Sequence, residues 1–236
     1  MLLSISSETI KARQGNTNYY ITNGVDRDFQ ESVFNSMNNL NNFSDKTRNA
    51  VSKIDNVIIL KDSDSAISDE FSNTKEKLDK YATDAYGFVS RKDKAIVINE
   101  HNHQRKDVSL EGSYADQAAD TVTHEIGHLI DEELSTTDTF KNAYLKDLKN
   151  IENMLNAGVT EIGGHDLRQM LVYLKHYMEG VDFSDGIDEK DITREGLREN
   201  FAECFSTIAD TSPSEINGIY AALFPNTMQT TYNFVI

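Results

Sequence analysis

The chain has 236 residues, and its 23 Lys and Arg against 39 Asp and Glu give a formal net charge of −16 at pH 7. We expect so acidic a chain to bind neither nucleic acid nor an anionic membrane. A single cysteine excludes an internal disulfide framework, and no apolar run approaches the length of about 18 residues that membrane insertion needs.

Taken in chain order, apolar residues recur at three- and four-residue steps along most of the sequence, which predicts helices. The predicted helices cover 26–40, 44–54, 115–131, 138–155, 166–177 and 193–210, with a last short one beginning at Pro225. The apolar run 56–60 is typical of a buried strand, and 86–90 and 94–99 flank a polar turn and predict a β-hairpin. Residues 1–25 predict only an irregular or short strand-like start. We therefore expect an α+β fold that is mostly helical, with a small β-sheet ahead of the helix at 115–131.

That helix contains the motif His-Glu-x-x-His, formed by His124, Glu125 and His128. Residues four apart lie one above the other on a helix, so both imidazoles can reach one metal ion. Glu125 projects beside them and can act on a water bound to that metal. The pattern is typical of metallopeptidases, which combine two zinc ligands and a general base in one helical turn.

The surroundings of the motif favour a site over a chance match on a solvated helix. Apolar residues at helical spacing would face the core and leave the histidines on another face; they are Val122, Ile126, Leu129 and Ile130. Gly127 lowers helix propensity in mid-helix and usually marks the close approach of another backbone, such as a neighbouring strand.

A catalytic zinc needs a third protein ligand, and the predicted helix 193–210 offers Glu199 and Glu203. These carboxylates are four residues apart and so share one helix face. Two such carboxylates beside a metal divide into two roles, since one binds zinc and the other accepts the ring N–H of a ligating histidine. Without His-Glu-x-x-His, the pair would be interpreted as a solvated acidic edge.

The other histidines and the cysteine are expected to have no part in the site. His101 and His103 fall in a polar segment and are interpreted as solvated surface. His165 is predicted at a helix start and His176 near a helix end, and both are interpreted as structural. Cys204 is interpreted as a core thiol rather than a nucleophile, because no base is paired with it in sequence.

The segment Glu199-Asn-Phe-Ala-Glu203-Cys-Phe, together with His-Glu-Ile-Gly-His followed by Asp131, resembles the family of the anthrax lethal factor catalytic domain and the Pro-Pro endopeptidases. The resemblance covers roughly 55–210. It implies a zincin-like fold in which a short sheet precedes the metal helix. It also implies that Glu199 is the third ligand and Glu203 supports the site. Residues 1–54 would then be an N-terminal helical segment packed on a metallopeptidase domain of residues 55–236, and the whole would form one compact unit.

The sequence departs from the family pattern at one position. The family has a tyrosine seven residues before the ligand glutamate, where its hydroxyl can stabilise the oxyanion, and this chain has Ile192 there. Tyr114, Tyr173 and Tyr177 are the nearest alternatives, each of which is interpreted as ordinary packing. We expect none of them to replace the hydroxyl fully.

The expected function is that of a zinc-dependent endopeptidase with one Zn²⁺ per chain, held by His124, His128 and Glu199, with Glu125 as general base. We expect a monomer whose protein or peptide substrate lies extended along an edge strand of the sheet, near 94–99. The resemblance implies secretion, although no signal peptide is visible and a cytoplasmic location is the alternative. The alternative function is a catalytically weak or inactive, zinc-stabilised binding domain of the same fold, which Ile192 favours and the retained Glu125 disfavours.

Overall fold

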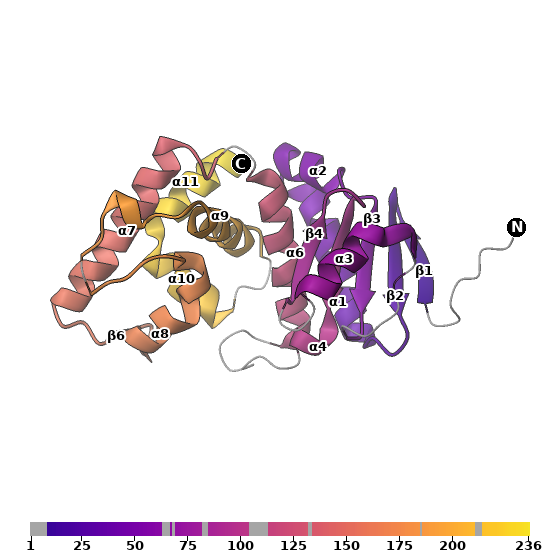
Figure 1. The fold of residues 1–236 in the computed structure, drawn as a ribbon, viewed down its shortest axis with the longest axis horizontal. Helices are drawn as coiled ribbons and strands as arrows, with labels where there is room; N and C mark the ends of the chain where they lie inside the picture. The colour runs from indigo at the N-terminus through magenta and orange to yellow at the C-terminus, as the bar shows by residue number, and fades with distance from the viewer. Residues whose placement is uncertain are drawn as a thin grey trace, which may run out of the picture. The chain divides into compact units, whose positions relative to one another are not determined.

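The computed structural model describes residues 9–62, 67, 69–81, 85–103, 113–131, 134–184, 186–210 and 214–236 (Figure 1). The chain divides into two compact units, Met1–Glu125 and Ile126–Ile236, and the boundary lies inside helix α6 (Tyr114–Ile130). The expected α+β class is confirmed, with most of the described residues in helices and a small sheet in the first unit. The division differs from the expected one at residue 54, because strands on both sides of that residue belong to one sheet.

The sheet of the first unit has five strands in the order β1-β2-β3-β5-β4. Their bounds are β1 (Thr9–Gln14), β2 (Thr17–Thr22), β3 (Asn56–Leu60), β4 (Gly87–Ser90) and β5 (Ala95–Asn99). The three inner strands run parallel, and β1 and β4 pair antiparallel at the two edges. The buried strand at 56–60 and the hairpin are confirmed. The strands β1 and β2 extend this sheet into the segment expected to be helical.

Helices cover both faces of this sheet (Figure 1). They are α1 (Arg27–Phe43), α2 (Asp45–Val51), the 3-10 turn η1 (Asp69–Phe71), α3 (Ser72–Tyr81) and α4 (Glu100–His103). Successive side chains of a strand point to opposite faces. Ile58 and Val97 pack on one face with Phe71 and Leu78 of η1 and α3. On the other face, Tyr19 of β2 meets Phe34 of α1 edge to face, with ring centroids 4.4 Å apart.

The edge strand β4 passes close to α6 within the first unit. A Cβ atom on Gly87 would lie 2.8 Å from a methyl carbon of Thr121 and 2.8 Å from the backbone carbonyl oxygen of Val97, so this position requires glycine. The expectation that 94–99 supplies an open edge is wrong, because β5 is paired with β3 on one side and with β4 on the other. In the described sheet, the edge next to α6 is β4.

In its described residues, the regular structure of the second unit is helical apart from one short two-stranded ribbon. Its elements are α7 (Asp138–Asn156), β6 (Glu161–Ile162), β7 (His165–Asp166), α8 (Leu167–Tyr173), η2 (Leu174–Met178), η3 (Glu189–Asp191), α9 (Arg194–Ala209), α10 (Glu215–Leu223) and α11 (Pro225–Val235). Aromatic rings on α7, α9 and α10, and on Phe224 between α10 and α11, pack in its core: Phe140 meets Phe201, and Phe224 meets both Tyr144 and Tyr220. These contacts fix α9, which carries Glu199. In the part of the chain that is described, no helix is long and apolar enough to cross a membrane.

Candidate metal centre

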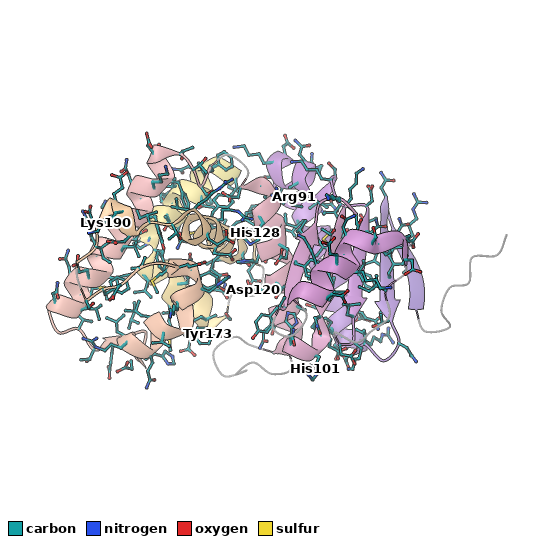
Figure 2. The ribbon with its side chains drawn as sticks, in the orientation of Figure 1. Arg91, His101, Asp120, His128, Tyr173 and Lys190 are labelled. Atoms are coloured by element: carbon teal, nitrogen blue, oxygen red, sulfur yellow. The ribbon has the colours of Figure 1, made fainter. Side chains whose placement is uncertain are left out.

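Helix α6 presents both histidines of the motif, and α9 supplies a carboxylate to them. The unit boundary falls between Glu125 and Ile126, but the helix is continuous across it. It carries His124 and, one turn later, His128, which is labelled in Figure 2. The Nε2 atom of His128 lies 3.4 Å from Oε1 of Glu199. Together these three residues offer one ligand atom each, and the three atoms all lie within 4.8 Å of one another. The expected ligand set is therefore brought together.

Two small residues allow α6 and α9 to approach this closely. A Cβ atom on Gly127 would lie 2.9 Å from Cα and 3.1 Å from the carbonyl oxygen of Ala202, distances at which backbone would have to move. Ala202 is three residues after Glu199 and Gly127 directly precedes His128, so the closest approach of the helices lies beside the ligands. The expectation of a close backbone neighbour at Gly127 is confirmed, although that neighbour is a helix and not a strand.

The three donors lie close enough together to hold one metal ion. Nitrogen and oxygen ligands about 2.0–2.2 Å from zinc at tetrahedral angles lie about 3.3–3.6 Å from one another. The distance of 3.4 Å between His128 and Glu199 falls in this range. Two histidines and one carboxylate are also a donor set of catalytic zinc sites, which keep a fourth position open. The described residues therefore form a group that could bind a metal ion.

Glu125 and the ligands lie in largely buried surroundings. Glu125, between the two histidines in sequence, is 8 % exposed. The side chains of His128 and Glu199 are 13 % and 8 % exposed. Burial strengthens electrostatic interactions, because less water screens the charges.

Glu199 has a second histidine neighbour that the sequence did not reveal. The Nε2 atom of His176, on η2, lies 3.0 Å from Oε2 of Glu199. The two oxygens of one carboxylate therefore face two different histidines. His176 was predicted to be structural because it sits near a helix end, and sequence spacing gives no signal for a contact across 23 positions.

Asp131, the residue that follows the motif, is also buried at the end of α6. Its side chain accepts a hydrogen bond from the backbone N–H of Ser135 at 3.0 Å and lies 4.0 Å from Nε of Arg198. Burial raises the pKa of Asp131 to about 6, although the hydrogen bonds from Ser135 and the charges of His128 and Arg198 oppose this rise. An acidic group whose charge is costly thus lies close to a metal-binding histidine.

The neighbours of Glu199 on α9 are buried as well. Glu203, expected to support a ligand histidine, is 4 % exposed and lies one helical turn after Glu199. Cys204 is fully buried, with Sγ 3.8 Å from both Oδ1 of Asn200 and the hydroxyl of Tyr220. Burial raises the pKa of this thiol to about 12, in keeping with the core thiol predicted from the sequence.

Of the histidines on α4 and β7, one has surroundings that differ from those expected. His103 is wrongly predicted to be solvated, since it is fully buried, with Nδ1 2.6 Å from the Asn99 carbonyl oxygen and Nε2 2.8 Å from the Thr121 hydroxyl. His101, on the same short helix α4, is exposed as expected (Figure 2). His165 faces Glu215 at 2.8 Å and has the structural role predicted for it.

The structure describes the surroundings of Ile192 and of two of the three tyrosines considered as its alternatives. Ile192 ends the turn η3 and is partly buried. Tyr177 packs edge to face against His176 and Tyr220, as expected for packing. Tyr173 is 38 % exposed (Figure 2). The side chain of Tyr114 lies outside the described residues.

The chain was compared with protein-family models, curated proteins and solved structures. No protein-family model, curated protein or solved structure matches the chain.

Proposed function

We propose that the protein is a zinc-dependent endopeptidase of the kind that the lethal factor resemblance implies. The observation that carries the proposal is the convergence of His124, His128 and Glu199, with His128 and Glu199 separated by the edge length of a zinc-centred tetrahedron. The buried general-base candidate Glu125 distinguishes this site from a purely structural zinc site, which uses four protein ligands.

In the proposed mechanism, three residues bind the metal and Glu125 transfers a proton. His124, His128 and Glu199 would hold one zinc ion per chain. A bound zinc ion supplies Lewis-acid chemistry, which polarises a carbonyl and lowers the pKa of a coordinated water. Glu125 accepts the proton of the attacking water and delivers it to the leaving amine as the peptide bond breaks. The limited exposure of Glu125 keeps competing water away from that transfer.

Strand β4 is the proposed support for an extended substrate. The Tyr86 carbonyl accepts a hydrogen bond from the Asn99 N–H. Along an antiparallel ladder, residues alternate between pointing their backbone N–H and C=O groups toward the partner strand and away from it, so those of Gly87 and Val89 point away from β5. The Val89 carbonyl accepts a hydrogen bond from Nζ of Lys77. Gly87 packs against Thr121, one turn before His124. A peptide paired at Gly87 would therefore run beside the helix that carries the first ligand.

Ile192 favours a second candidate, a catalytically weak, zinc-stabilised binding domain. Loss of one oxyanion donor typically lowers the rate by about 10²–10³. Such a domain would still bind peptides along β4. We also propose that the endopeptidase is a monomer and that it is secreted, as the family resemblance implies.

The test is cleavage of a broad peptide library by zinc-loaded protein, with and without a chelator. We expect chelator-sensitive cleavage, and we expect Glu125→Gln to retain zinc while its rate falls at least about a hundredfold. Equal cleavage by Glu125→Gln would disprove the mechanism. Zinc binding without cleavage of any library member would support the binding domain.

A further inference from the structure

We propose that His176 is a positioning residue that holds the carboxylate of Glu199 in its metal-binding orientation. The inference rests on the proposed metal centre and adds a residue to it. The geometry that carries it is the division of one carboxylate between two histidines, with Oε1 3.4 Å from Nε2 of His128 and Oε2 3.0 Å from Nε2 of His176.

A hydrogen bond to the outer oxygen matters because a carboxylate can rotate about its terminal bond. The Glu199 side chain is only 8 % exposed, so water cannot substitute fully for a protein donor. When Nε2–H of His176 donates to Oε2, Oε1 is left facing His128. Carboxylates that bind metals are commonly held by such hydrogen bonds, and these bonds tune metal affinity.

The turn that carries His176 is fixed in place, so the imidazole is presented to α9 by a rigid element. Leu174 and Met178, at the two ends of η2, are 1 % and 3 % exposed. The carbonyl of Tyr177 accepts a hydrogen bond from the Tyr144 hydroxyl at 2.9 Å. The ring of Tyr177 also packs edge to face against the His176 ring.

His176 does not act as a further ligand in this arrangement. In the described part of the chain, the group of donors that all lie within 4.8 Å of one another consists of His124, His128 and Glu199. His176 reaches the opposite oxygen of the same carboxylate. Its side chain is 67 % exposed, so its removal takes little from the packed core.

The same unit offers a matched control in His165 and Glu215. Nε2 of His165 lies 2.8 Å from Oε1 of Glu215, a pair similar in length to that of His176 and Glu199. The Glu215 side chain is 51 % exposed, and Glu215 is not a member of the metal-binding group. Removing His165 therefore deletes a histidine–glutamate pair without touching a proposed ligand.

The experiment measures the zinc affinity of the full chain by competition with a chelator and the melting temperature of the metal-free protein. We expect His176→Ala to weaken zinc binding by about 10–100-fold at unchanged melting temperature. His176→Gln, whose amide N–H can donate in place of the ring N–H, should recover most of the affinity. His165→Ala should bind zinc as the wild type does.

Three outcomes would overturn the inference. The first is a zinc affinity of His176→Ala equal to that of the wild type. The second is a loss of zinc affinity in His165→Ala as large as that in His176→Ala. The third is a zinc affinity of His176→Gln as low as that of His176→Ala. Failure of the proposed metal centre looks different, because the wild-type protein itself would then bind no zinc. Zinc binding without peptidase activity would leave the role of His176 intact.

Discussion

His103 and His128 are both inside the molecule, yet only one of them is suited to bind a metal. In the first unit, His103 is fully buried, and both of its ring nitrogens lie within hydrogen-bond distance of protein oxygens on Asn99 and Thr121. His128 has Nε2 opposite a buried carboxylate at 3.4 Å, next to a second imidazole one turn away. The comparison shows that burial alone does not make a ligand. A ligand needs a nitrogen lone pair directed to a point that other donors share.

The sharpest test of this contrast compares Glu199→Ala with His103→Ala. We expect Glu199→Ala to abolish stoichiometric zinc binding, because it removes one of three protein ligands. We expect His103→Ala to retain zinc but to lose about 1–3 kcal/mol of stability, because it leaves buried hydrogen-bonding partners unsatisfied. Metal content after dialysis and denaturant unfolding measure the two effects. One zinc per chain in Glu199→Ala would refute the ligand assignment.

The same contrast shows what could be predicted from the sequence. The ligands His124 and His128 follow from spacing within one helix, and Glu199 from the chemistry of a third donor. The strand 56–60 and the helix beginning at Asp138 were also predicted, because local periodicity and turn residues determine them. Apart from Glu199, which was predicted from the donor set that a metal site requires, these are features in which neighbours in sequence are neighbours in space.

The features missed from the sequence depend on long-range packing. Strand β2 pairs in parallel with β3 across 38 positions, from Asn18 to Asn56, and no local pattern reveals such pairing. The burial of His103 arises because its short helix α4 packs its ring against Phe29 and Tyr86, at ring-centroid distances of 5.2 and 5.4 Å. The contact of His176 with Glu199 likewise joins two elements that are separate in sequence.

Glu203 is a buried polar residue that, like His103 and His128, can belong either to the metal site or to the core. If it supports a ligand histidine, Glu203→Ala should weaken zinc binding by about 10–100-fold while Glu199 still holds the metal. Glu203→Gln removes the negative charge of the side chain but keeps its shape, so comparison with Glu203→Ala shows which of the two affects zinc affinity. Competition with a chelator gives the affinity. An unchanged zinc affinity combined with lower stability would place Glu203 in the core beside Cys204.

The last expected effect concerns Asp131, whose charge is costly in the metal-free protein. Its pKa is raised to about 6 from 3.8, mainly by burial. Because the folded state binds this proton more tightly than the unfolded state, the contribution of Asp131 to stability is fully present below pH about 4 and is lost as the pH rises through about 6. At 1.36 kcal/mol per pKa unit, the loss is at most about 3 kcal/mol.

Asp131→Asn removes this titration while its side-chain oxygen can still accept the hydrogen bond from Ser135. The variant and the wild type should therefore have similar unfolding free energies near pH 4, and the metal-free variant should be the more stable at pH 7.5. Glu161→Gln, on an exposed residue, controls for the loss of one negative charge from a chain of net charge −16. Urea unfolding at the two pH values measures the difference. If Asp131→Asn is destabilised equally at both, the carboxylate serves the packing around His128 in its charged form, and its neighbours Arg198 and Ser135 outweigh burial.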